Sequence, residues 1–227
     1  MAQAIPRTTI GPSRGVIARI RERHGLGAAI QFIAHWLVNR VLFFDWLHII
    51  ALERDSVRPF DSKLSRHVRS RFANRTDLLA MQATPELDID DAKLELFDRG
   101  DECLLSYVDD RLAGYTWIHP QGEPELIPGL VISIPHDYLY NYSGLTVPEH
   151  RGLGLQPYRH HLVLDSNRWG VRRGLIGFVL HTNFASRAGQ GKSGYRNIGS
   201  IWVVGSRNHF LAVFSRSLRR RAIRRIQ

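Results

Sequence analysis

The sequence predicts one mixed α/β domain of the α+β type, with a basic segment at each end. The chain has 227 residues, of which 44% are hydrophobic, enough for one core and too few for two full enzymatic domains. From residue 61, strand-like and helix-like segments alternate. All of the net charge of +10 comes from the ends, because residues 1–60 carry +4, residues 215–227 carry +6, and the rest balances.

These observations divide the chain into an N-terminal amphipathic helical extension (1–60), a central domain (61–214) and an Arg-rich C-terminal tail (215–227). Only three of the 31 basic residues are Lys, and the others are Arg. Codon usage explains this excess of Arg as well as phosphate binding does. We therefore expect no specific nucleic acid partner. Cys103 is the only cysteine, which excludes an intrachain disulfide and a cysteine-based zinc site. We expect it to be buried, in a cytoplasmic, reducing compartment.

Residues 16–44 carry an apolar stripe at helical spacing, with arginines off the stripe. Its members are Val16, Ile20, Gly27, Ile30, Ile33, Leu37, Val41 and Phe44. Polar residues interrupt the run too often for a membrane span, and nothing before it looks like a secretory signal. Three interpretations stay open: a helix packed on its own domain, a basic helix on an anionic membrane surface, or packing against a partner helix.

The first half of the central domain predicts a short strand at 68–72, a helical segment that opens at Thr76 and Asp77, and another helix at 90–97. Two extended runs, 102–108 and 112–119, are joined by Asp109-Asp110-Arg111 and predict a hairpin. Residues 119–135 hold four of the ten prolines and predict a surface loop.

The most informative segment is a strand, a glycine turn and a helix. Residues 138–147 are rich in β-branched and aromatic side chains, Pro148 ends the run, and Arg151-Gly152-Leu153-Gly154 leads into a helical stretch up to Trp169. Glycines let backbone amides converge, and a helix N-terminus adds partial positive charge, so such a turn can hold a pyrophosphate. A dinucleotide fingerprint fits less well, because Pro157 stands at its third glycine.

Here the chain resembles the GCN5-related N-acetyltransferase (GNAT) superfamily over residues 64–214. The family's Val-x-Pro-x-x-Arg-Gly-x-Gly motif is similar to residues 147–154 from the proline onward, with Val147 directly before it. After a strand at 174–180, the family's second block is matched by Asn183, Ser186 and Gly194-Tyr195. The resemblance implies a central, mostly antiparallel twisted sheet that splays between its fourth and fifth strands and is flanked by helices.

The resemblance also implies the cofactor contacts of an acyl-coenzyme A, acetyl by default. The backbone of Leu145, Thr146 and Val147 would pair with the pantetheine arm, and the Leu145 amide would face the thioester oxygen. Asn183 and Ser186 would face the same arm, although Asn183 alone could simply cap the next helix. The pyrophosphate would lie on the amides of Arg151, Gly152, Leu153, Gly154, Leu155 and Gln156.

The family's catalytic side chains are not matched. Gln190 stands where many members have a Tyr that protonates the departing thiolate, and 176–180 lacks the Glu of others. We therefore expect His181, which titrates nearest neutrality, and Tyr140 to be the catalytic residues, with Asp137 and Tyr142 as alternatives. His160 and His161 lack ligand spacing, and we expect no metal.

The tail, Ser215–Gln227, interleaves six arginines with apolar residues, which predicts either a solvated tail or a basic amphipathic helix on an anionic membrane. Taken together, the sequence predicts an acyl-CoA-dependent N-acyltransferase that transfers directly to a small-molecule or peptide amine. A homodimer and peripheral contact with a membrane both stay open. The rival interpretation is a GNAT-scaffold binding protein that has lost its chemistry and attaches to a polyanion or membrane.

Overall fold

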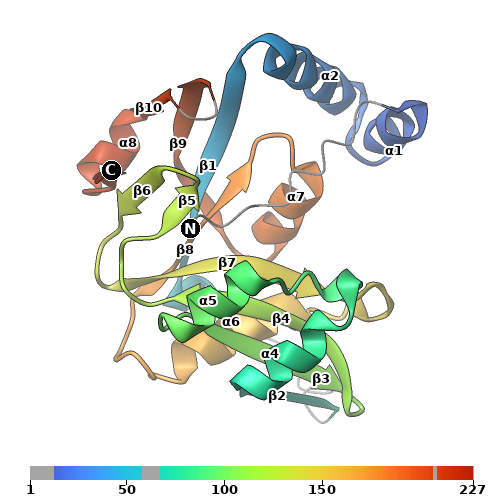
Figure 1. Ribbon diagram of the computed structural model, residues 1–227, viewed down its shortest axis with the longest axis vertical. Coiled ribbons are helices and arrows are strands. Elements are labelled where there is room, and N and C mark those ends of the chain that lie inside the picture. The colour runs from blue at the N-terminus through green and yellow to red at the C-terminus, as the bar shows by residue number, and fades with distance from the viewer. Residues whose placement is uncertain (1–12, 58–66, 207–208, 227) are drawn as a thin grey trace.

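The computed structural model describes residues 13–57, 67–206 and 209–226 (Figure 1). One eight-stranded sheet runs through the molecule, and every pair of neighbouring strands is antiparallel except β7 and β8. The predicted fold class is thus confirmed. The order is β10 (Phe210–Phe214), β9 (Arg196–Gly205), β1 (Phe43–Glu53), β8 (Gly174–Leu180), β7 (Tyr138–Thr146), β4 (Arg111–His119), β3 (Glu102–Val108) and β2 (Val68–Phe72).

Helices cover both faces of the sheet (Figure 1). On one face, α4 (Arg75–Gln82) and α5 (Asp91–Asp98) share a core cluster with a three-stranded sheet of β5 (Glu125–Ile127), β6 (Leu130–Ser133) and β11 (Arg224–Arg225). On the other face, α6 (Leu155–Asp165) adds Val163 and Leu164 to a second cluster. The domain also contains α7 (Phe184–Lys192), α8 (Arg216–Arg220) and the short 3-10 turns η1 (Arg54–Ser56), η2 (Pro85–Leu87) and η3 (Pro148–His150).

The predicted hairpin is confirmed as β3 and β4. Asp109 and Asp110 both have positive φ, 47° and 62°, the conformation that matches a tight turn to the twist of its strands. The predicted surface loop at 119–135 is wrong, because it holds β5 and β6, and Leu126, Leu130 and Ile132 are fully buried. Its prolines lie outside those two strands.

The N-terminal segment supplies more than a helical extension. Gly25, with φ 88°, separates α1 (Arg14–His24) from α2 (Leu26–Val41). The predicted stripe is therefore divided between two helices, and its last member, Phe44, lies on strand β1. The following strand β1 lies in the middle of the sheet, between β8 and β9. Residues 43–53 therefore belong to the same core as residues 68–214, although they precede the predicted start of the central domain at residue 61.

The C-terminal tail is not a solvated appendage. Leu218 on α8 and Ile223 are fully buried in the core cluster beneath β5 and β6, and the Ile226 N–H donates to the Val131 carbonyl at 3.0 Å. The six arginines stay exposed. The tail is therefore amphipathic, and the domain itself covers most of its apolar side.

Truncation after Phe214 is expected to destabilise the fold strongly. Loss of one fully buried Leu or Ile typically costs ~2–5 kcal/mol, and truncation removes two such side chains together with β11. Leu218→Ala with Ile223→Ala should reproduce most of the loss in a urea melt, whereas Arg216→Ala with Arg220→Ala should not. A truncated chain that melts like the full chain would contradict the packing described here.

Candidate functional site

The sheet opens between β7 and β8. The two strands pair only from Tyr138 to Tyr140, opposite Gly174 to Ile176. Beyond that point β7 stays with β4 and β8 stays with β1. The register of β7 shifts against β4 at Ser143, a non-glycine residue with φ 44°, and a bulge of this kind re-aims a strand. Ser143 and Gly144 are exposed, so the opening begins there.

Residues 145–147 border this opening, and among their backbone polar groups only those of Thr146 point into it. The Val147 N–H donates to the Ala113 carbonyl at 3.0 Å, and the Leu145 carbonyl accepts from Arg159 Nη2 at 3.1 Å. Successive residues of a strand point their polar groups to opposite edges. Thr146 therefore faces away from β4, which favours its amide over that of Leu145 as the donor to a bound group.

The glycine turn connects β7 to α6 with its amides open. Gly152 and Gly154 have φ 86° and 73°, and a Cβ at Gly152 would meet no atom within 4 Å. Gly154 is the N-cap and offers no side-chain cap. The N–H groups of Leu155 and Gln156 come first in the helix, where no intrahelical carbonyl is available to them, and the macrodipole favours an anion there. Pro157 adds no donor.

Helix α7 lies across the opening from this turn. The Asn183 side chain accepts from the Ser186 N–H at 3.0 Å, so it caps α7, and contact with a pantetheine arm stays a prediction for both residues. A Cβ at Gly144 or at Gly189 would lie 3.9 Å from the Gln156 amide, which places that side chain between β7 and α7. The Gln190 Oε1 is buried and unpartnered among the described residues.

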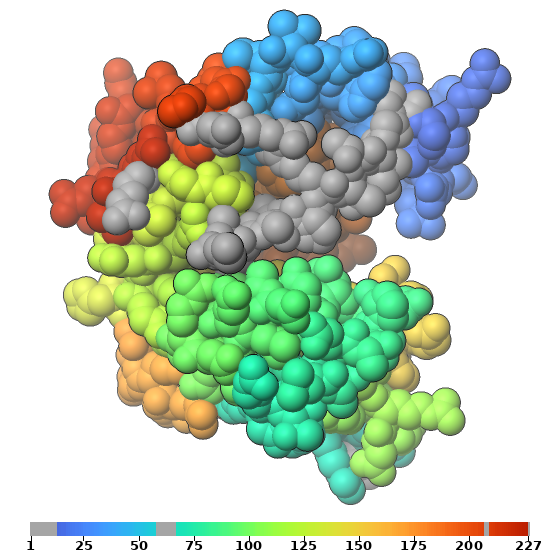
Figure 2. Space-filling model, viewed as in Figure 1, coloured from blue at the N-terminus to red at the C-terminus, as the bar shows by residue number. Residues whose placement is uncertain are grey.

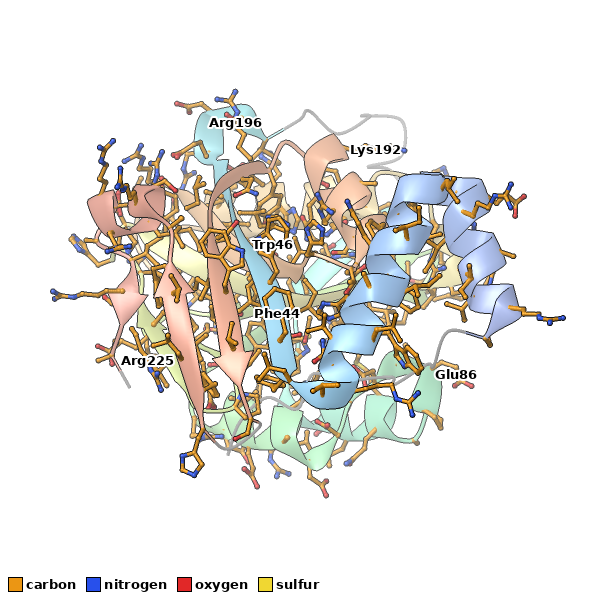
Figure 3. The ribbon with its side chains drawn as sticks, turned by 90° about the horizontal axis from the view of Figure 1, so that it is seen from above. Phe44, Trp46, Glu86, Lys192, Arg196 and Arg225 are labelled. Atoms are coloured by element: carbon orange, nitrogen blue, oxygen red, sulfur yellow. The ribbon has the colours of Figure 1, made fainter. Side chains whose placement is uncertain are left out.

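A histidine pair lies at the end of β8. The His181 Nδ1 is 2.8 Å from Nε2 of His48 on β1, and the Trp46 ring stacks on His181 with centroids 3.9 Å apart and planes 3° apart. Figure 3 looks down on β1, with Trp46 on the strand and α2 alongside. The Arg187 guanidinium of α7 donates to the His181 carbonyl at 3.0 Å. These contacts fix the orientation of the His181 ring.

The hydrogen bonds around Asn197 set the tautomer of the pair. The Gly199 N–H donates to Asn197 Oδ1 at 2.8 Å, so the Asn197 Nδ2 is the group that faces His48 Nδ1 at 2.8 Å. An amide nitrogen only donates, so His48 accepts at Nδ1 and carries its proton on Nε2. His181 then accepts at Nδ1 and carries its own proton on Nε2. The neutral pair thus presents a hydrogen-bond donor, the Nε2–H of His181.

Both histidines are neutral at pH 7. Burial, followed by the charges of Arg187 and His181, lowers the pKa of His48 to about 4. The pKa of His181 is lowered by burial, then by Arg187 and His35. Both causes disfavour a cation, so the tautomer described above persists through the physiological range.

Tyr140, the second predicted catalytic residue, lies on the other face of the sheet. Its side chain belongs to the cluster beneath α4 and α5, whereas His48 follows the Ile50 and Leu52 side chains into the opposite one. Tyr140 is fully buried, and burial, followed by the charge of Asp101, raises the pKa of its hydroxyl well above the ordinary value. The structure does not bring Tyr140 and His181 together.

The alternative candidates are also occupied elsewhere. Tyr142 donates to Asp101, and Asp137 lies 4.0 Å from Arg173. Cys103 is buried, as predicted. His160 is buried edge-on against Tyr195 while His161 pairs with Asp165 at the surface. Across the described ranges, no three His, Cys, Asp or Glu side chains gather to hold a metal.

No family model and no curated protein matches this sequence. Solved structures similar to it include a Staphylococcus epidermidis protein of unknown function (TM-score 0.49, 12% identity, 77% of this chain and 66% of that chain). Another is a GCN5-related N-acetyltransferase from Kribbella flavida (TM-score 0.46, 13% identity, 77% and 63%). This chain thus spans just under two thirds of the length of those chains.

A mostly antiparallel sheet that separates between β7 and β8, followed directly by the glycine turn and α6, is the arrangement that the two sequence motifs predicted. Gly194 and Tyr195, from the second motif, have structural roles: a Cβ at Gly194 would meet the Ser56 carbonyl at 2.5 Å, and the Tyr195 hydroxyl donates to Asn141 Oδ1.

Sequence reasoning missed His48, Trp46, Asn197 and Arg159. His48 and His181 are 133 residues apart, and only the pairing of β1 with β8 brings them together. The one available signal was a polar and aromatic pattern, Asp45-Trp46-Leu47-His48, inside an otherwise apolar run. Arg159 lies in the helical stretch that follows the glycine turn, and its side chain is buried.

Arg159→Met is expected to lower affinity for coenzyme A about tenfold without loss of stability. Arg159 Nη2 holds the Leu145 carbonyl and Thr146 Oγ1 at 3.1 and 2.8 Å, and a hydrogen bond to a charged group contributes ~1.5–3 kcal/mol. Burial lowers the pKa of Arg159 to about 10, so it stays charged at pH 7. Replacing a buried ion with an apolar side chain is often neutral or stabilising.

Calorimetry with coenzyme A and a thermal melt of the same sample test this expectation. Arg168→Met removes an exposed arginine elsewhere on the same face and is the matched control. Unchanged affinity in a folded Arg159→Met protein would show that Arg159 does not position β7 for binding.

Proposed function

We propose that this chain is an N-acyltransferase that uses an acyl-coenzyme A, acetyl by default, and transfers the acyl group directly to an amine. The observation that carries the proposal is the continuity of three parts: the β7–β8 opening, the glycine turn and the uncapped N-terminus of α6. The first offers a free strand edge to a pantetheine arm, and the other two offer amides to its pyrophosphate. The two motif matches support the same assignment.

In this proposal the glycine turn binds the cofactor and the histidine pair provides a hydrogen-bond donor. Leu155, Gln156 and the residues of the turn bind the diphosphate through main-chain N–H groups, and Thr146 holds the arm. When bound, the acyl thioester supplies an activated carbonyl. The His181 Nε2–H donates a hydrogen bond to the thioester oxygen as that oxygen gains negative charge. The new C–N bond replaces the C–S bond, and the proton that the amine nitrogen loses ends on the leaving coenzyme A sulfur. His48, Asn197 and Trp46 are positioning residues, since each acts through the His181 ring.

The test is a binding and turnover measurement on the full chain. Calorimetry with acetyl-CoA and with free coenzyme A should show micromolar binding of both, and release of thiol should require an added amine from a panel of amino acids, polyamines and N-terminal peptides. Binding without turnover on any amine would support the catalytically inactive scaffold instead. Absence of binding would contradict the proposal outright.

A further inference from the structure

The outward face of α2 is apolar and exposed. Leu26, Ile30, Leu37, Val38 and Val41 are between 43% and 92% exposed. At 100° per residue these five side chains, with Ala34, fall within one sector about 120° wide that contains no charged residue. Other proteins of this size rarely expose a continuous stripe of this kind unless something covers it.

The inward face of α2 is held in place by specific bonds. Asn39 Nδ2 donates to the Phe44 carbonyl at 2.8 Å, and the Phe44 N–H donates back to Asn39 Oδ1 at 3.2 Å. Ala29 is buried, and at the end of α1 His24 packs against Phe184 of α7. The two helices therefore have one fixed orientation on the domain, and the apolar sector points away from it. Figure 2 shows α1 and α2 together at one edge of the molecule.

The same two helices carry a strong positive charge. Residues 14–41 contain five arginines and one acidic residue, Glu22, a net charge of +4. Arg14, Arg19, Arg21 and Arg23 are exposed along α1. Arg40 lies over the Trp36 ring at 5.0 Å. Arginines next to an apolar stripe, with a tryptophan at their border, are the composition of helices that lie in a membrane interface.

We propose that the α1–α2 hairpin docks on a membrane surface that contains anionic lipids, with the α2 sector in the acyl boundary and the α1 arginines among the headgroups. A second copy of this chain is the other apolar occupant to consider. A symmetric pair would bring two hairpins of charge +4 face to face, and like charges across an interface oppose association. Anionic headgroups attract the same charge. No helix in the described part of the chain is long and apolar enough to span a membrane.

This inference does not depend on the acyltransferase proposal, but it has a consequence for the candidate site. The inward His35 of α2 lies close enough for its charge to lower the pKa of His181. A membrane on the outward face would thus lie one helix away from the histidine pair.

Sedimentation with vesicles of phosphatidylcholine and phosphatidylglycerol, 70:30, tests the proposal. The full chain should sediment with them and not with pure phosphatidylcholine. Ile30→Gln/Leu37→Gln/Val41→Gln removes about half of the stripe and should weaken binding at least about tenfold. The matched control, Val171→Gln/Leu211→Gln, changes exposed apolar residues elsewhere and should bind like the unaltered chain.

The charge contribution is tested separately. Arg14→Gln/Arg19→Gln/Arg23→Gln should weaken binding by about fivefold per arginine at low salt. Arg216→Gln/Arg220→Gln/Arg224→Gln removes the same charge from the tail and should have a much smaller effect. Binding that all four variants retain would overturn the proposal, as would binding lost equally in the tail variant. A dimer in light scattering that the stripe variant abolishes, with no vesicle binding, would assign the face to a second copy.

Discussion

Gly152→Asp is expected to lower affinity for coenzyme A at least about 100-fold. A Cβ at this position meets nothing within 4 Å, and Asp adopts positive φ more readily than most residues, so the fold should survive. The added carboxylate would lie where the diphosphate binds, and two like charges ~4 Å apart near a protein surface repel by about 4 kcal/mol, which is more than a hundredfold in affinity.

Gly152→Asn is the matched control, since it adds the same bulk without the charge. Calorimetry on both variants, after a melt shows them to be folded, separates repulsion from crowding. Affinity in Gly152→Asp equal to that of the unaltered chain would remove the turn from the cofactor site.

His181→Phe is expected to lower turnover ~10²–10³-fold, the range typical for loss of one oxyanion hydrogen-bond donor, while leaving affinity for coenzyme A within a few-fold. His181→Gln distinguishes two roles, because a glutamine amide can donate a hydrogen bond at the position of Nε2 but cannot give up a proton. If His181 only stabilises an oxyanion, the Gln variant should keep most of the activity. If it protonates the leaving sulfur, both variants should fail.

His67→Gln changes an exposed histidine on the far edge of the sheet and serves as the control. The pH profile adds an independent check. Because the pKa values of His48 and His181 are lowered in the folded protein, the loss of turnover in acid should come below pH 6.5, the ordinary pKa of a histidine. Turnover in His181→Phe within threefold of the unaltered chain would exclude His181 from the reaction.

The same lowered values predict the direction of stability with pH. Unfolded His48 titrates near 6.5 and folded His48 near 4, so between these values the unfolded chain binds more protons. Stability from this residue is therefore complete above pH 6.5 and declines as the solution becomes more acidic.

The local elements of the fold were determined by the sequence alone. The β3–β4 hairpin followed from two extended runs and a short polar turn, β8 matched its predicted bounds, and the strand, turn and helix around Gly152 followed from the glycine spacing. These features depend on neighbouring residues, because turn conformation and side-chain alternation act over a few positions. The cofactor side of the candidate site is built from such a local segment and was predictable for that reason.

Only the tertiary structure showed which strands and side chains from distant parts of the sequence are neighbours. Nothing near residue 48 indicates that β1 enters the sheet next to β8, and the tautomer of His181 depends on Asn197, which reaches His48 from a third strand. The tail shows the same limit: alternating arginines and apolar residues fit a free amphipathic helix and a packed segment equally well, and only the core beneath β6 decides between them. The spacing of apolar residues in the sequence shows which face of a segment is apolar. The element that covers that face is far away in the sequence, so no spacing pattern identifies it.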